Sequence, residues 1–117
     1  MISMNSNSEL AFVNNMNYHD NFLIYKIIKK TLTKSARKIR FLYEMEDFGP
    51  LQHYINHTKF CFQTLRQEKL ENASTFIENQ LINKNYHLDN EIANYLNEIK
   101  KFLTDYRSTI KALKKNE

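Results

Sequence analysis

The chain has 117 residues, of which 42% are hydrophobic and 26% charged, and its formal net charge is +4 at pH 7. These values predict one globular domain, 1–117, that is large enough to bury a core. One glycine and one proline leave little material for hairpins or phosphate-binding loops. The single cysteine excludes an internal disulfide. The sequence has neither an apolar run of membrane-spanning length nor the features of a signal peptide, so we expect a cytoplasmic protein without a membrane partner.

The first two predicted elements are a short helix and a long one. Ser8 is a suitable N-cap for the short helix, which ends in the asparagine-rich segment 14–17. Asp20 is a suitable N-cap for the second helix, which we expect to run for about seven turns and to end near Glu46. Apolar residues three and four apart define its predicted buried face: Phe22, Tyr25, Ile28, Leu32, Ala36, Ile39 and Leu42.

The segment 47–70 carries the most informative pattern and is predicted to form an amphipathic helix. Asp47 is placed to cap it, and Pro50 lies in its first turn, where a missing N–H costs little. The predicted buried stripe is Leu51, Tyr54, Ile55, Thr58, Cys61, Phe62 and Leu65. The opposite side holds His53, Asn56, Phe60 and Gln63, with Lys59 at its edge. An aromatic beside an imidazole, an amide and a lysine is unusual on a solvent face, so we expect any function there.

Two further amphipathic helices complete the predicted fold. The fourth helix presents Leu70, Ala73, Phe76, Ile77 and Leu81. After a turn at residues 83–85, Asp89 is placed to cap the last helix. Its apolar residues are Ile92, Leu96, Ile99, Leu103, Tyr106, Ile110 and Leu113. Four long helices with short connections predict an all-α, antiparallel up-down four-helix bundle over residues 20–115, preceded by an N-terminal arm and short helix over residues 1–19.

The third helix resembles that of the histidine-containing phosphotransfer (HPt) domains of multistep two-component signalling. The resemblance spans about residues 21–113 and rests on positions that match without a gap: Asp47, Phe48, Leu51, Lys59, Phe62, Leu65 and Leu70. Ile77 and Glu78 resemble the apolar–acidic pair of the family's fourth helix. The resemblance implies a phosphorelay module whose partner is the receiver domain of a response regulator or a hybrid kinase. Phe60 is then the expected docking anchor, with His53 and Gln63 beside it.

The chain departs from this family at the phosphorylated histidine, whose matched position holds Asn56. An asparagine amide is not a nucleophile toward an aspartyl phosphate, whereas a neutral imidazole is. We therefore favour a relative that docks a receiver domain without a phosphorylatable histidine at the usual position, with Lys59 as a supporting residue. The alternative acceptor is the neighbouring His57, which would enter the register only through a deletion that turns all later side chains by about 100°. Phe60 and Arg66 also replace a small residue and a glycine of the family.

The residues indicate no cofactor, metal site or enzymatic activity. His53 and His57 are four residues apart on one helix, but a stable zinc site needs three or four protein ligands. His19 and His87 lie at the starts of other helices. No serine or cysteine lies with a placed histidine and acid, and Cys61 is expected to be a small packing residue.

Basic residues supply the alternative function. One acid-free stretch between Asp20 and Glu44 holds Lys26, Lys29, Lys30, Lys34, Arg37, Lys38 and Arg40. The last helix adds Lys100, Lys101, Arg107, Lys111, Lys114 and Lys115. Such a surface attracts nucleic-acid phosphates, so a basic helical adaptor or a nucleic-acid-associated protein is the second interpretation. We expect no stacking aromatics on this basic surface, and the sequence shows no helix-turn-helix pattern, so nucleic acid ranks behind the receiver domain as the partner.

Overall fold

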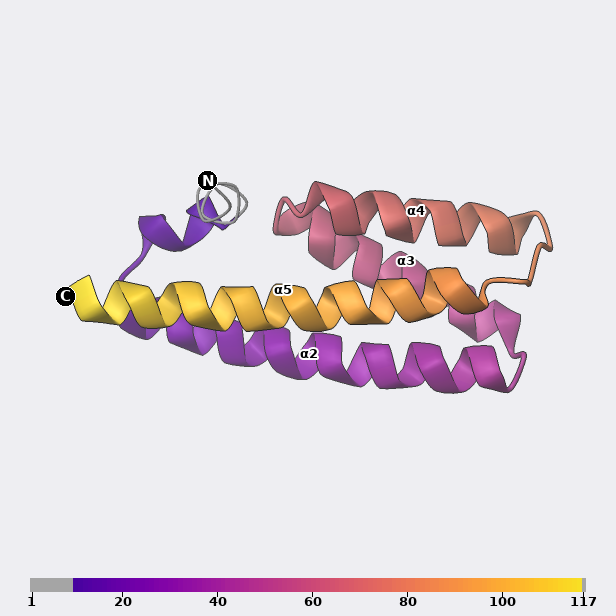
Figure 1. The fold of residues 1–117 in the computed structure, drawn as a ribbon, viewed down its shortest axis with the longest axis horizontal. Coiled ribbons are helices and arrows are strands. Elements are labelled where there is room, and N and C mark those ends of the chain that lie inside the picture. Colours follow the sequence, from indigo (N-terminus) through magenta and orange to yellow (C-terminus); the bar gives the residue numbers. More distant parts are fainter. Residues whose placement is uncertain (1–9, 117) are drawn as a thin grey trace.

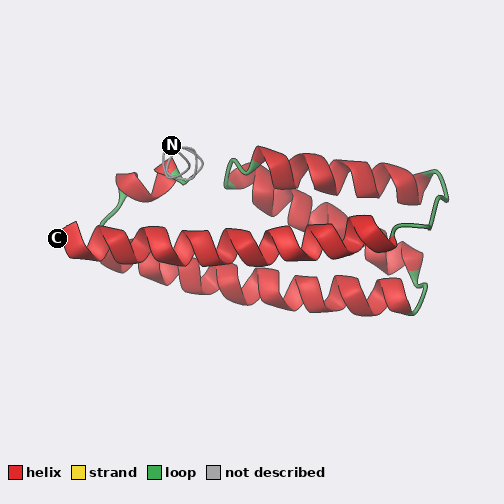
Figure 2. Ribbon diagram, in the orientation of Figure 1, coloured by secondary structure: helices red, strands yellow, loops and turns green. Residues whose placement is uncertain are grey.

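The computed structural model describes residues 10–116, which form a short 3-10 helix and four long α-helices (Figure 1). These are η1 (Ala11–Asn15), α2 (Tyr18–Glu44), α3 (Phe48–Thr64), α4 (Glu68–Ile82) and α5 (Asp89–Asn116). Over the described residues, Figure 2 shows helices joined by short loops and no strand. The predicted all-α four-helix bundle with a short N-terminal element is therefore confirmed.

The bundle is built from helices that pack against their neighbours in the chain, and α5 closes it against α2. α2 and α5 are the longest helices and extend together beyond α3 and α4 (Figure 1). The centre of the core, where each side chain is at most 1% exposed, contains Leu32, Ile39, Leu51, Ile55, Phe62, Ile77 and Ile99. Among the described helices, none is long and apolar enough to cross a membrane.

The described part of the N-terminal arm, which begins at Leu10, packs onto the bundle through η1. The short helix predicted to begin at Ser8 is instead this 3-10 helix, and Ser8 lies outside the described residues. Leu10 and Val13 are buried. The buried Asn21 amide donates hydrogen bonds to the carbonyls of Val13 and Met16, at 2.6 and 3.1 Å. One polar side chain of α2 thus ties the arm to the bundle.

The start of α2 differs from the prediction because Asn17, and not Asp20, is its N-cap. The Asn17 Oδ1 accepts a hydrogen bond from the Asp20 N–H at 2.9 Å. Asn21 is fully buried, whereas Phe22, predicted to face the core, is 39% exposed. The buried face therefore begins one position earlier, because the arm needs the amide of Asn21 inside. The helix ends at Glu44, with Met45 as its C-cap, close to the end predicted near Glu46.

The two aspartates predicted as caps have smaller roles than expected. Asp47 is the N-cap of α3, but its side chain makes no capping hydrogen bond. Asp89 is the first residue of α5 and not its cap. Pro50 lies in the first turn of α3 as predicted. The buried stripe of α3 is confirmed, with Leu51, Ile55, Thr58 and Phe62 buried and Tyr54, Cys61 and Leu65 partly buried against the core.

The first three α-helices end in the same backbone motif, with a non-glycine residue in the left-handed region. These residues are Glu46, Arg66 and Lys84, with φ of 56°, 56° and 60°. At the end of α3 the Arg66 N–H donates to the Gln63 carbonyl at 3.1 Å, and the Gln67 N–H donates to the Phe62 carbonyl at 2.8 Å. α3 therefore ends at Thr64, before the end of the segment 47–70 that was predicted to be helical.

A polar contact lies inside the core between α3, α4 and α5. The Tyr95 hydroxyl is 2.5 Å from the Thr58 Oγ1 and 2.6 Å from the Ser74 Oγ. Burial raises the pKa of Tyr95 to about 12, so this hydroxyl is neutral at pH 7. The sequence pattern placed Phe76 on the buried face of α4, but Phe76 is 50% exposed while Ser74 is fully buried. A small side chain faces the core here because the ring of Tyr95 occupies the space.

Candidate docking face and basic groove

The outer side of α3 exposes a large aromatic ring among polar side chains. Phe60 is 57% exposed, and His53 and Gln63 are exposed on the same helix. We call these three residues the docking face. The Lys59 Nζ lies 5.9 Å from the centroid of the Phe60 ring, within the range of a cation–π contact. The structure thus brings together the aromatic, imidazole, amide and lysine that the sequence predicted on this side.

Asn56 and Lys59 do not point freely into solvent, because both contact Glu78 of α4. The Asn56 Nδ2 donates to the Glu78 Oε2 at 2.7 Å, and the Lys59 Nζ pairs with the Glu78 Oε1 at 2.6 Å. The side chains of Lys59 and Glu78 are only 23% and 12% exposed. Asn56 is partly buried, so the expectation that it faces solvent holds only in part: the largely buried carboxylate of Glu78 on α4 needs donors, and α3 supplies two.

The Asn56–Glu78–Lys59 network contains no imidazole. The Asn56 amide is not a nucleophile, and both oxygens of Glu78 already accept hydrogen bonds. The sequence resemblance singled out Glu78 without giving it a role. Its contact with Asn56 could not be read from either helix alone, because it depends on how α4 is rotated against α3.

The candidate substitute acceptor, His57, is exposed on α3. Its ring centroid lies 6.2 Å from that of His53, one helical turn away. No group of three or more His, Cys, Asp or Glu side chains in the described part of the chain is arranged to hold a metal ion. The imidazole of His57 is open to solvent and is not part of the Asn56–Glu78–Lys59 network.

Cys61 lies on the boundary between α3 and the core. It is partly buried and packs against the core cluster, as predicted. Burial raises the pKa of the Cys61 thiol, which keeps it protonated at pH 7. A neutral, half-buried thiol is a poor nucleophile, so the structure gives Cys61 a packing role.

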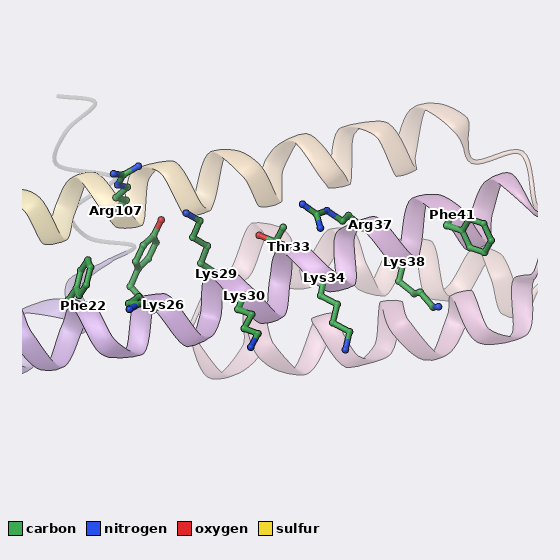
Figure 3. Close-up of a pocket in the computed structure, with 11 residues that line it drawn as sticks. Phe22, Lys26, Lys29, Lys30, Thr33, Lys34, Arg37, Lys38, Phe41 and Arg107 are labelled. Carbon is green, nitrogen blue, oxygen red and sulfur yellow. The ribbon is translucent and has the colours of Figure 1, made fainter.

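The predicted basic residues of α2 separate into two rows (Figure 3). Lys29, Thr33 and Arg37 are directed toward α5, whose Arg107 also lines this side of the molecule. Lys30, Lys34 and Lys38 point away from α5. We call this second set, together with Lys26, the outer row; its members are four residues apart and all are exposed. The first row forms one wall of a groove between α2 and α5 with a volume of about 800 Å³.

Comparison with known proteins assigns no function to this chain, so the functional argument rests on its geometry. No family model matches the chain, and neither a curated protein nor a solved structure matches it.

Proposed function

We propose that this protein is a phosphotransfer-like signalling module that binds a receiver domain through the docking face, with Asn56 at the position of the usual phosphorylated histidine. The main support is the exposed ring of Phe60 on α3 of a four-helix bundle. A receiver domain of a response regulator or a hybrid kinase is the proposed partner. The proposed site of action is the cytoplasm.

The physical case for Phe60 is that an exposed aromatic ring gains much from burial in an interface. Phenylalanine gives a large apolar contact area, and an aromatic at the centre of a patch with a polar rim commonly dominates binding. His53 and Gln63 supply that rim, and the Lys59 Nζ lies over the Phe60 ring, 5.9 Å from its centroid. Glu78 holds Lys59 in place, so little side-chain entropy is lost when a partner arrives.

The test is the affinity of the full chain for a panel of phosphorylated receiver domains, with and without Phe60→Ala. We expect saturable binding to at least one receiver domain, and a loss of about thirtyfold in affinity in the variant. The melting temperature should stay almost unchanged, because more than half of the Phe60 surface is already in solvent.

Phe76→Ala is the matched control. Phe76 is 50% exposed on α4, so the variant loses the same chemical group with a similar exposure from a different surface. Its affinity should equal that of the unchanged chain. Equal losses in both variants, or saturable binding that neither variant weakens, would contradict docking at Phe60.

Nucleic-acid binding by the outer row is the second candidate function. It is favoured by four exposed lysines, Lys26, Lys30, Lys34 and Lys38, that form no ion pair within the described residues. Phosphate contacts of this kind give an affinity that falls steeply with salt. Replacing Lys30, Lys34 and Lys38 with glutamine should then abolish binding to a mixed-sequence duplex and leave receiver binding in place.

A further inference from the structure

The groove between α2 and α5 has an apolar floor. Tyr25, Leu96 and Ile99 are buried below it, and Ala36 and Leu103 are partly buried. On α5 the floor residues Leu96, Ile99 and Leu103 are three and four apart, which is the spacing of one helix face. Along α2 the groove runs from Tyr25 to Glu44, a length of about 28 Å at the rise of an α-helix.

The walls of the groove are strongly basic. Its cationic side chains come from both helices and are Lys29, Arg37, Arg40, Lys100, Arg107 and Lys111. Glu44 is the acidic residue among the groove residues. The ion pairs in the described part of the chain, Lys59–Glu78 and Lys69–Glu98, involve none of these six cations. Like charges on facing walls repel one another, and an anionic ligand between them would remove that repulsion.

We propose that this groove binds an acidic amphipathic helix of a protein partner. Apolar residues of such a helix, spaced by three and four, would pack on the accessible apolar surface of the groove, which Ala36, Leu103 and the exposed ring of Phe41 supply. Its acidic residues would lie on both flanks, against the cations of the two walls. A helix of about five turns matches the length of the groove. The proposal is independent of receiver docking, because no residue of the docking face lines the groove.

A helix fits the groove better than nucleic acid does. A duplex backbone presents phosphates but no apolar surface to cover the floor. A single strand binds by stacking successive bases on several exposed aromatic rings, whereas of the two aromatic residues that line the groove Phe41 is exposed and Tyr25 is buried. Phe41, 54% exposed beside the groove, adds apolar surface that a helix side chain can cover.

The test is selection of displayed helical peptides by the full chain. The library carries apolar residues at helical spacing, with acidic, neutral and basic flanks equally represented. We expect the enriched peptides to carry acidic flanks. A synthetic peptide from the enriched set should bind saturably, whereas a peptide of the same composition in scrambled order should bind at least about tenfold more weakly, a difference of 1.4 kcal/mol.

A steric block separates groove binding from general attraction of charge. Thr104→Trp places a large neutral side chain in the groove, where the exposed Thr104 hydroxyl donates to the Lys100 carbonyl. Thr75→Trp on α4 is the matched control, because the exposed Thr75 hydroxyl makes the same bond to the Glu71 carbonyl. The first change should weaken peptide binding by about tenfold or more, and the second should leave it unchanged.

Two charge variants of equal size complete the test. One replaces the groove lysines Lys29, Lys100 and Lys111 with glutamine, and the other replaces the outer-row lysines Lys30, Lys34 and Lys38. Each removes three positive charges, so attraction by net charge alone would fall equally in both. The groove variant should lose at least about tenfold in affinity and the outer-row variant less than about threefold.

Three results would overturn the proposal. One is enrichment without a preference for acidic flanks, or no enrichment at all. The second is peptide binding that Thr104→Trp does not weaken. The third is that acidic peptides do not bind, whereas a mixed-sequence RNA or phosphatidylserine vesicles bind and lose affinity when the groove lysines are replaced. That result would assign the groove to nucleic acid or to a membrane surface.

Discussion

Two tyrosine hydroxyls in the core are buried alike but partnered differently. The Tyr95 hydroxyl contacts Thr58 and Ser74, and these two also donate to the carbonyls of Ile55 and Leu70. The three hydroxyls carry three protons, so three of these four contacts can be hydrogen bonds at any one time. The buried Tyr106 hydroxyl has no hydrogen-bond partner within the described residues. Burial raises the pKa of both tyrosines to about 12.

Replacing each tyrosine with phenylalanine should separate the two cases. Tyr95→Phe removes a hydroxyl with two partners and should lower the free energy of unfolding by about 1 kcal/mol. Tyr106→Phe removes a buried hydroxyl without a partner and should leave that free energy unchanged or raise it. Urea denaturation followed by circular dichroism measures both. Equal losses would mean that the polar contact of Tyr95 contributes nothing specific.

The proposed function makes a prediction about phosphoryl transfer that depends on Asn56 of α3. The unchanged chain should carry no stable phosphohistidine after incubation with a phosphorylated receiver domain, because Asn56 has no nucleophilic atom. Asn56→His should gain acid-labile phosphate. The imidazole N–H can donate to Glu78 as the Asn56 amide does, which leaves the other ring nitrogen free to attack phosphorus as the aspartate carboxylate leaves.

The lability of the phosphate in acid and base identifies the modified residue. His57→Gln, made in the unchanged chain and in the Asn56→His chain, is the control for the exposed neighbouring imidazole. Acid-labile phosphate on the unchanged chain that His57→Gln removes would make His57 the acceptor and contradict the assignment of Asn56 as a silent position.

At the scale of the element, the end of α3 is held in a conformation that suits glycine. Arg66 has a φ of 56°, where an L side chain costs about 1–2 kcal/mol. Arg66→Gly should remove that cost. The greater conformational freedom of glycine in the unfolded chain offsets part of this gain, so the net stabilisation should be roughly 0.5–1 kcal/mol. Lys101→Gly, exposed inside α5, should destabilise by about 1 kcal/mol instead. Thermal denaturation distinguishes the two signs, and a loss of stability in both would contradict a strained helix end.

The helices could be predicted because apolar residues recur with a clear period, but their exact faces could not. Contacts with other elements decide which side of each helix is buried. The Asn21 side chain of α2 is buried where it bonds the N-terminal arm, and the small Ser74 of α4 is buried where it contacts Tyr95. These demands leave Phe22 and Phe76 exposed although both fit the apolar pattern. Tyr95 itself was missed, because the neighbouring leucine already completed the spacing of α5.

In the candidate site, the exposure of single side chains could be predicted, whereas contacts between helices could not. The exposure of Phe60 follows from its angle on α3, opposite the buried stripe. The pairing of Asn56 and Lys59 with Glu78 depends on how two helices meet, and no periodicity within one helix contains that information. The arrangement of lysines into an outer row and a groove likewise requires the position of α5.

At the scale of the whole molecule, the bundle presents two separate surfaces. The docking face lies on α3, while the basic groove lies between the long helices α2 and α5. The surfaces differ in character: one is an aromatic ring with a polar rim, and the other is an apolar channel between cationic walls. The two surfaces share no residue, so the two proposals can be tested separately.

The measurement that tests receiver docking most directly is an NMR titration of the isotope-labelled full chain with an unlabelled phosphorylated receiver domain. Docking at Phe60 predicts saturable amide shifts that centre on residues 53–63 of α3 and continue onto α4 around Glu78. The same titration of the Phe60→Ala chain should give much weaker shifts. Saturable shifts confined to α2 and α5, or no saturable shift with any receiver domain of the panel, would contradict the account.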